Sequence, residues 1–405
     1  MSVGGARGKR DVSLPILPKT QPQTQPPVTK TETTAPVTTP KVVPTTFQQN
    51  GVTTGPVSIE GKSAKTEHVR SSGGGLGFDT VSSDSPTVKR KEGRQASVGL
   101  DTTKLYQKGD RLPVLEGLPS KLHKLQLEVN AEFEADPQKF VDRYRAMVNA
   151  EGGVPTFAVD DSKGALRPEQ WLGADGLTPE VKEFRAGGAN AAMHQAAHAC
   201  TQMAFVQRLD ELAKLPPGDP KRNVLVTNGG CGAGKGYALK QGLSPDFKNQ
   251  FGAIWDAAGE QSGLDNKWII QEAAKRGIKV TMVYVNADPV KAFERAVTKR
   301  FDEEGRLVNT RSFAESYVDG GENMRALIRD FDKQPGELEL VIVDNTGPKP
   351  TAETFTKENI HEAQGDLMNI IQAGWEDVRL LHEQLQKMVP PTMPDVAKRG
   401  LCVLD

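Results

Sequence analysis

The chain has 405 residues, and its 51 Lys and Arg residues nearly balance its 52 Asp and Glu residues, which gives a formal net charge of −1. The length suffices for one or two cores, whereas the balanced charge provides no electrostatic basis for binding nucleic acid. No run of about 18 apolar residues is present, so we expect no membrane span. Three widely separated cysteines and the lack of an apolar signal segment favour a reducing, cytoplasmic environment and argue against a disulfide framework or a structural zinc site.

Residues 1–112 are rich in proline, threonine and glycine and contain few aromatic side chains. Such a segment cannot bury enough apolar surface to offset the entropy lost on ordering. We therefore predict a disordered leader, followed by a core that begins near Leu118. A long polar leader is also typical of an effector that is exported through a narrow secretion channel into a host cell.

Apolar residues at helical spacing begin at Leu122, and the pattern is interrupted at Asp136 and Pro137. This pattern predicts two consecutive helices. Residues 154–188 show no periodicity, so we expect irregular structure there. Residues 189–215 are rich in alanine and are followed by two prolines, which predicts a long helix.

Two histidines on that helix, His194 and His198, are four residues apart, a spacing that can bring two ligands to one metal ion. No pattern of Asp, Glu or Cys residues nearby completes such a site. We interpret both histidines as packing or capping residues and predict no metal-binding side chains.

The most informative segment is a short apolar run, residues 224–227, followed by a glycine-rich run up to Gly236. The spacing from Gly229 to Gly234 and Lys235 matches the pattern G-x-x-x-x-G-K of a phosphate-binding loop, or P-loop. In such a loop a buried strand, small residues and a helix start surround an anion with backbone N–H groups.

Lys235 would contact the outer phosphates of a nucleotide, but Gly236 stands where a Ser or Thr normally holds Mg²⁺. The alternative is a glycine-rich turn that joins a strand to a helix without binding a ligand. The residues expected to bind nucleotide are Gly230, Cys231, Gly232, Ala233, Gly234, Lys235 and Gly236.

Strands and helices alternate after this loop, which predicts an α/β fold with a parallel sheet between two layers of helices. Ligands of such sheets bind beyond the carboxyl ends of the strands, where the loop, Asp256 and residues 286–288 would lie. The expected strands are residues 251–256, 278–285 and 338–344, and the expected helices are residues 265–276, 289–301, 312–331 and 364–388.

From residue 140 to residue 347 the chain resembles the zeta-toxin family of P-loop small-molecule kinases. The resemblance implies a three-layer, P-loop kinase-like α/β fold and three parts: a leader (1–112), a kinase domain (113–350) and a C-terminal helical extension (351–405). The segments that carry it, in the family's order, are residues 139–146, 193–198, 230–235, 254–257, 288–293, 300–306 and 343–347.

Members of that family transfer the γ-phosphoryl group of ATP to a hydroxyl group of a small molecule, such as a nucleotide sugar, and related effectors act on dinucleotides. The resemblance implies ATP and Mg²⁺ as cofactors, a role as toxin or effector, and an antitoxin or secretion chaperone as partner. It assigns Lys235 to the phosphates, Asp256 to the acceptor hydroxyl, and Arg300 and Arg306 to a basic lid.

Other interpretations of these residues stay open. Asp256 at a strand end could cap the following turn, and Glu260, which we assign to the substrate, is the rival catalytic acid. Arg300 and Arg306 lie beside several acidic residues and could form an ordinary solvated helix end. Because Gly236 lacks a hydroxyl group, the rivals to a kinase are a nucleotide-binding protein that acts through partner recognition and an NTP hydrolase.

Overall fold

The computed structural model describes residues 104–401, with gaps at residues 175, 242, 244–245, 257–259, 306 and 372–376 and without the side chains of residues 260–264, 298–302, 304 and 396. The chain divides into two units, Met1–Ser85 and Pro86–Asp405, and every described residue belongs to the second unit. The predicted disordered leader therefore lies outside the described residues up to residue 103.

The packed part of the chain begins before the boundary expected at residue 112. Tyr106 and Leu112 are buried in the main hydrophobic core, and the Tyr106 ring lies 5.4 Å from the Phe133 ring, centroid to centroid. The Tyr106 N–H donates a hydrogen bond to Oε1 of Gln202 at 3.2 Å. Two buried side chains in an otherwise aperiodic segment produce no periodic pattern in the sequence, so the predicted boundary lies too far along the chain.

The helices α1 (Ser120–Ala135) and α2 (Pro137–Ala150) form the consecutive pair that the sequence predicts. Asp136 separates them, and its carboxylate accepts a hydrogen bond from the Lys139 N–H at 3.3 Å. Pro137 occupies the first position of α2, where a missing N–H leaves no helical hydrogen bond unmade.

The segment at residues 154–188, expected to be irregular, contains short regular elements instead. None of them is long enough to show a repeating pattern, since β1 has 3 residues and α3 has 8 residues. The elements are β1 (Thr156–Ala158), α3 (Val159–Leu166), α4 (Pro168–Trp171), α5 (Pro179–Phe184) and the π-helical turn η1 (Arg185–Ala189).

The long helix expected at residues 189–215 is interrupted near its start. The short helix α6 (Asn190–Ala192) ends at Met193, and α7 (His194–Leu212) follows. Most side chains of the first half of α7 are buried, so this helix passes through the core.

The sheet contains six strands in the order β1-β3-β2-β4-β5-β6. All neighbouring pairs are parallel except β5 and β6, which are antiparallel. The later strands are β2 (Asn223–Gly229), β3 (Ala253–Asp256), β4 (Lys279–Asn286), β5 (Leu338–Asp344) and β6 (Thr351–Phe355). The three strands expected after the loop are present, whereas β6 was not expected: it lies at the edge with only Phe355 buried, so it lacks a strand-like apolar pattern.

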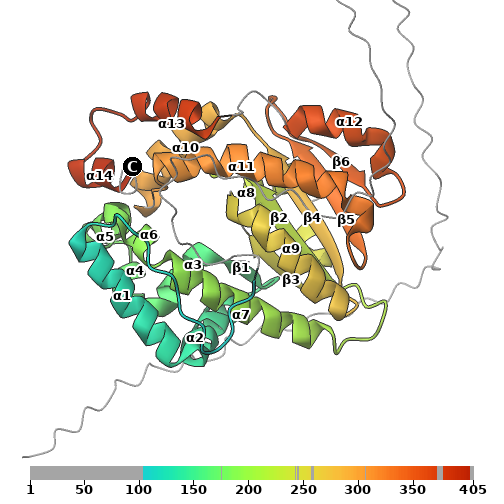
Figure 1. Ribbon diagram of the computed structural model, residues 1–405, viewed down its shortest axis with the longest axis horizontal. Helices are drawn as coiled ribbons and strands as arrows, with labels where there is room; N and C mark the ends of the chain where they lie inside the picture. The colour runs from blue at the N-terminus through green and yellow to red at the C-terminus, as the bar shows by residue number, and fades with distance from the viewer. Residues whose placement is uncertain are drawn as a thin grey trace, which may run out of the picture. The chain divides into compact units, whose positions relative to one another are not determined.

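Helices cover both faces of the sheet, which gives the three layers expected from the alternation of elements (Figure 1). Alternate residues of β2 divide between the faces: Val224 and Val226 face the larger core and Leu225 the smaller one. The larger core is covered by α7, α9 (Glu260–Lys275), α11 (Thr310–Arg329) and α12 (Ile360–Ile371); the smaller core is covered by α8 (Lys235–Gln241).

The C-terminal extension is part of this packing and contains two helices where one was expected at residues 364–388. Helix α12 contributes Ile360 and Leu367 to the larger core, and α13 (Val378–Lys387) packs on α11 through Leu381 in a separate cluster. That cluster also contains side chains from α10 (Pro289–Glu304) and α14 (Asp395–Leu401). None of the described helices has the length and apolar character needed to cross a bilayer.

Candidate functional site

The glycine-rich segment, residues 229–236, connects β2 to α8 at the carboxyl edge of the sheet. The strands that follow it lie on opposite sides of β2, with β3 on one side and β4 on the other. Such a reversal of strand order opens a crevice at the carboxyl edge, which is where parallel sheets bind their ligands. The loop therefore occupies the position that the fold offers for a ligand.

The backbone of the loop curves back on itself. Gly232 and Gly234 have φ angles of 69° and 80°, in the left-handed region that favours glycine. A turn hydrogen bond joins the Ala233 N–H to the Gly230 carbonyl at 3.1 Å, which leaves the N–H groups of Gly232 and Gly234 without an acceptor among the described residues. Successive N–H groups in such a turn form a concave site for an anion.

Three side chains hold the loop from outside. The Ser316 hydroxyl accepts the Cys231 N–H at 3.0 Å, the Tyr317 hydroxyl donates to the Cys231 carbonyl at 2.9 Å, and the Asn345 amide donates to the Ala233 carbonyl at 2.9 Å. Burial raises the pKa of Tyr317 well above its ordinary value, so its hydroxyl stays protonated and keeps donating at neutral pH.

Sequence reasoning missed these three residues. Asn345 follows the end of β5, so its strand-end position was an available signal, but Ser316 and Tyr317 come from a helix far along the chain and carried none. The Tyr317 ring also explains one glycine of the loop, since a Cβ at Gly230 would lie 2.3 Å from that ring.

Lys235 and Gly236 begin α8. The Lys235 side chain is half-buried and makes no hydrogen bond or ion pair with any described residue, so its ammonium is available to a ligand. Gly236 is exposed, and a Cβ placed there would meet no atom within 4 Å. Neither crowding nor backbone conformation requires glycine at position 236.

Asp256 is the last residue of β3 and lies between two strands. Its Cα pairs with those of Ala158 in β1 and Thr227 in β2, so the sheet fixes its backbone on both sides. The hydroxyl of Thr227 donates a hydrogen bond to Oδ1 of Asp256 and orients the carboxylate. Thr227 was missed as a site residue, although its position two residues before the glycine-rich loop was visible in the sequence.

The other predicted site residues are only partly described. Glu260 is the first residue of α9, which begins earlier than the helix expected at residues 265–276, and its side chain lies outside the described residues. Arg300 belongs to α10, but its side chain is not described, and Arg306 lies outside the described residues altogether. The substrate contact of Glu260 and the basic lid stay predictions.

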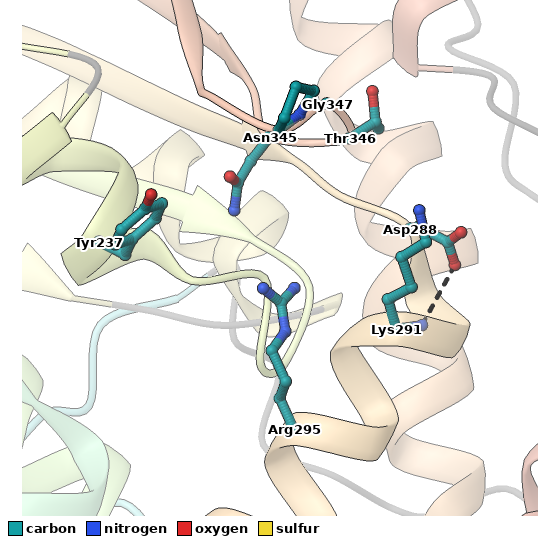
Figure 2. A pocket seen from close by; sticks show the side chains of 8 residues that line it. Tyr237, Asp288, Lys291, Arg295, Asn345, Thr346 and Gly347 are labelled. Atoms are coloured by element: carbon teal, nitrogen blue, oxygen red, sulfur yellow. Dashed lines mark hydrogen bonds between the residues drawn. The ribbon is translucent and has the colours of Figure 1, made fainter.

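A cavity of about 430 Å³ opens beside α8, and its lining comes from the chain that follows β2, β4 and β5. In Figure 2 the Arg295 guanidinium and the Asn345 amide point toward the same space, with the Tyr237 ring at its side. Since Asn345 also donates a hydrogen bond to the loop carbonyl of Ala233, this cavity lies beside the loop. The lining residues are Tyr237, Asp288, Lys291, Arg295, Asn345, Thr346, Gly347 and Pro348.

The histidine pair lies in the described part of the chain, where no group of three His, Cys, Asp or Glu side chains that could hold a metal ion is found. His198 is buried, and its Nε2 lies 2.9 Å from Oδ1 of Asp265. The same carboxylate oxygen accepts a hydrogen bond from Nε1 of Trp268 at 2.9 Å. His198 thus has the packing role expected for it, between α7 and α9.

No protein-family model matches the chain, and no curated protein matches it.

Proposed function

We propose that this protein is an ATP-dependent phosphotransferase that transfers the γ-phosphoryl group to a hydroxyl group of a small metabolite, as a zeta-toxin-type kinase does. The observation that carries the proposal is the geometry of residues 229–236: a curved glycine loop at the reversal point of the sheet. An available Lys235 lies in it, and Asp256 ends the neighbouring strand. Phosphoryl transfer needs this combination of anion-binding groups and one positioned carboxylate.

The cavity of about 430 Å³ supports ATP as the donor. Its volume falls within the range of about 300–1,000 Å³ usual for small-molecule sites. The loop would bind the phosphates, and the cavity would hold the nucleoside, with the Tyr237 ring available for stacking and the Asn345 amide for hydrogen bonding. Lys291 and Arg295 add positive charge on the same side.

In the transfer step the acceptor oxygen attacks the γ-phosphorus, the bond from that phosphorus to the β,γ-bridging oxygen breaks, and ADP leaves. The proton of the acceptor hydroxyl passes to Asp256. The hydrogen bond from Thr227 keeps that carboxylate in place. Lys235 stabilises the negative charge on the transferred group and on the leaving phosphate.

Mg²⁺ accompanies ATP and neutralises phosphate charge when it is bound. Among the described residues near the loop few ligands are available for it, because the Gly236 side chain provides no oxygen and Oδ1 of Asp344 already accepts hydrogen bonds from the N–H and hydroxyl groups of Thr346, at 3.1 and 2.8 Å. Phosphate oxygens and water would therefore supply most of the ligands of the ion.

Glu260 as an acceptor contact, Arg300 and Arg306 as a lid, and a toxin or effector role with an antitoxin or secretion chaperone belong to the same proposal. The lid and the antitoxin or chaperone follow from the resemblance, the effector role also from the polar composition of residues 1–112, and the role of Glu260 from its position four residues after Asp256.

The test incubates the protein with ATP labelled at the γ-phosphate and a panel of hydroxyl-bearing metabolites, and separates the products by chromatography. We expect label on a metabolite with wild-type protein and none with Lys235→Ala. Label that appears only as inorganic phosphate would instead identify an NTP hydrolase.

A second candidate, a nucleotide-binding protein without turnover, is favoured by the missing hydroxyl at Gly236. It predicts that calorimetry detects ATP binding while no label moves.

A further inference from the structure

A second, smaller cavity touches the loop at Cys231 and Gly232. Its volume of about 20 Å³ is close to the roughly 10–15 Å³ that one water molecule needs. Two polar side chains, Asp160 and Asn190, line it, and the remaining lining residues are Ala296, Val297, Leu307, Val308 and Phe313. A single small polar group of a ligand would fill it.

A buried lysine holds the two polar side chains in place. Lys163 is fully buried, and its ammonium donates hydrogen bonds to the Asp160 carboxylate, at 2.5 Å, and to the amide oxygen of Asn190. Its Nζ also lies 5.4 Å from the centre of the Trp171 ring. The Asp160 side chain, by contrast, is 37% exposed, so this cluster connects the interior with the cavity.

Stability alone is a weak reason for such a cluster. Burying an ammonium group carries a large desolvation cost, and apolar side chains of similar size often stabilise a core equally well. In this cluster the buried Lys163 ammonium fixes the orientation of two polar side chains that line the same cavity as the glycine-rich loop. Fixed polar groups beside a loop of that kind are a feature of ligand recognition.

The cluster stands on the same side of β2 as Asp256. Asp160 comes two residues after Ala158, whose Cα pairs with that of Asp256 in the parallel strands β1 and β3. The larger cavity is lined by residues that follow β2, β4 and β5. The smaller cavity also borders Ala296 and Val297 of α10, but its two polar side chains come from the chain between β1 and β2. If that larger cavity holds the nucleoside of ATP, the cluster lies on the acceptor side.

We infer that Asp160 and Asn190 determine acceptor specificity by binding a second, non-reacting hydroxyl group of the acceptor. The acceptor would then be a vicinal diol, with one hydroxyl at Asp256 and its neighbour at Asp160. The inference rests on the proposed phosphotransferase function and adds to it the chemical class of the acceptor.

The chemistry of the cluster favours a hydroxyl over other groups. A carboxylate only accepts hydrogen bonds, whereas Asn190, whose oxygen is engaged by Lys163, offers its amide N–H as a donor. A hydroxyl group both donates and accepts, so it satisfies both residues. Because Lys163 balances the charge of Asp160, the cluster does not select a cation, and the cavity is too small for a phosphate.

The experiment measures label transfer from γ-labelled ATP to the small-molecule fraction of a cell extract, with the full chain and with two variants. Asp160→Asn removes the carboxylate, and Asn190→Leu removes the amide while leaving the Asp160–Lys163 ion pair intact. Asp161→Asn is the matched control, because Asp161 is the next residue of α3 and does not line the cavity. Thermal unfolding and calorimetry with ATP accompany each assay.

We expect both variants to transfer label about tenfold more slowly or worse at limiting extract, since each removes a hydrogen bond to the acceptor. The deficit should shrink as the extract concentration rises, ATP affinity should stay unchanged, and Asp161→Asn should match wild type. Cleaving vicinal diols in the extract with periodate, which is removed before ATP is added, should abolish the transfer.

Wild-type transfer rates in Asn190→Leu and in a folded Asp160→Asn, or transfer that survives periodate, would overturn the inference and leave the phosphotransferase proposal standing. Loss of ATP binding in both folded variants would also overturn it, because the cluster would then support the loop. If wild-type protein transfers no label to any compound, the proposed function fails and the inference fails with it.

Discussion

The two halves of the sheet, one on each side of β2, differ in how the chain places their residues at the candidate site. On one side, β4 and β5 come from consecutive strand–helix units, and the chain after them lines the larger cavity. On the other side, the three-residue strand β1 precedes β2 in the sequence and joins the site only by pairing with β3. The position of the β4–β5 half can be inferred from the local sequence pattern. The position of the β1–β3 half depends on contacts between segments that are distant in the sequence.

This difference assigns separate tasks to the halves. The β4–β5 half would bind the phosphate donor, and the β1–β3 half, which includes Asp256, would bind the acceptor. Substitutions in the loop, which both halves share, should therefore abolish phosphoryl transfer altogether. Substitutions in one half should weaken the binding of either the donor or the acceptor and leave the other unchanged.

The largest effect is expected at the loop itself. Lys235→Ala should lower phosphoryl transfer by at least about 10³-fold, because it removes a positive charge from the transferred group. The fold should persist, since Lys235 contacts no described residue through a hydrogen bond or ion pair. Lys240→Ala, an exposed lysine of the same helix, is the matched control. A variant at position 235 that unfolds, or that turns over ATP normally, would refute the loop assignment.

Asp256→Asn should lower transfer by roughly 10²-fold or more while preserving ATP affinity, because the amide cannot take the acceptor proton. Rates of label transfer and calorimetry with ATP measure the two quantities. Glu260→Gln should mainly weaken acceptor binding. Near-normal phosphoryl transfer by Asp256→Asn, together with a large loss of transfer in Glu260→Gln, would show that Glu260 and not Asp256 accepts the proton.

Two buried tyrosines offer a paired comparison between the halves. Tyr317 donates to the Cys231 carbonyl of the loop, whereas the Tyr144 hydroxyl accepts the Ala158 N–H at 2.8 Å and donates to the Ala158 carbonyl at 3.0 Å in β1. Removing one such hydrogen bond typically costs about 1 kcal/mol, or several-fold in affinity.

Tyr317→Phe should therefore raise the Kd for ATP several-fold, and Tyr144→Phe should raise the acceptor KM with little change in ATP binding. The donor titration is made by calorimetry and the acceptor titration by label transfer. Equal effects of both variants on both substrates would contradict the division of tasks.

The smallest effect is expected from Gly236→Ser. A hydroxyl at this position restores the usual magnesium ligand, and the space around Gly236 is open, so Mg²⁺-dependent ATP binding should strengthen a few-fold. Calorimetry with and without Mg²⁺ measures the gain. Weaker binding would mean that the loop holds its nucleotide in a geometry that does not use this ligand.

Much of the fold was predictable because long elements carry periodic patterns. The strand Leu338–Asp344 was expected at these residues, and the helix pair divided by Asp136 was expected as well. Edge strands β1 and β6 were missed because one is too short and the other too exposed to show an apolar pattern. These two strands are stabilised by pairing with neighbouring strands, and a local sequence pattern contains no information about that pairing.

The candidate site shows the same limit. Gly229 to Lys235 form a motif of contiguous residues, so their position beside Asp256 could be inferred from strand order. The side chains that fix the site, Thr227, Tyr317 and Lys163, act through contacts that exist only in the folded chain. The sequence motif was therefore enough to locate the loop. The side chains that hold the loop and its neighbours in place could be identified only from the structure.

The central claim is that γ-phosphate moves from ATP to a metabolite hydroxyl at this loop. Phosphorus NMR of wild-type protein with Mg²⁺, ATP and a small-molecule extract follows that phosphate directly. The account predicts that the γ-phosphate signal falls while a phosphomonoester signal rises in equal amount, and that Lys235→Ala shows neither change. Loss of the γ-phosphate signal into inorganic phosphate alone, or an unchanged spectrum with wild-type protein, would contradict it.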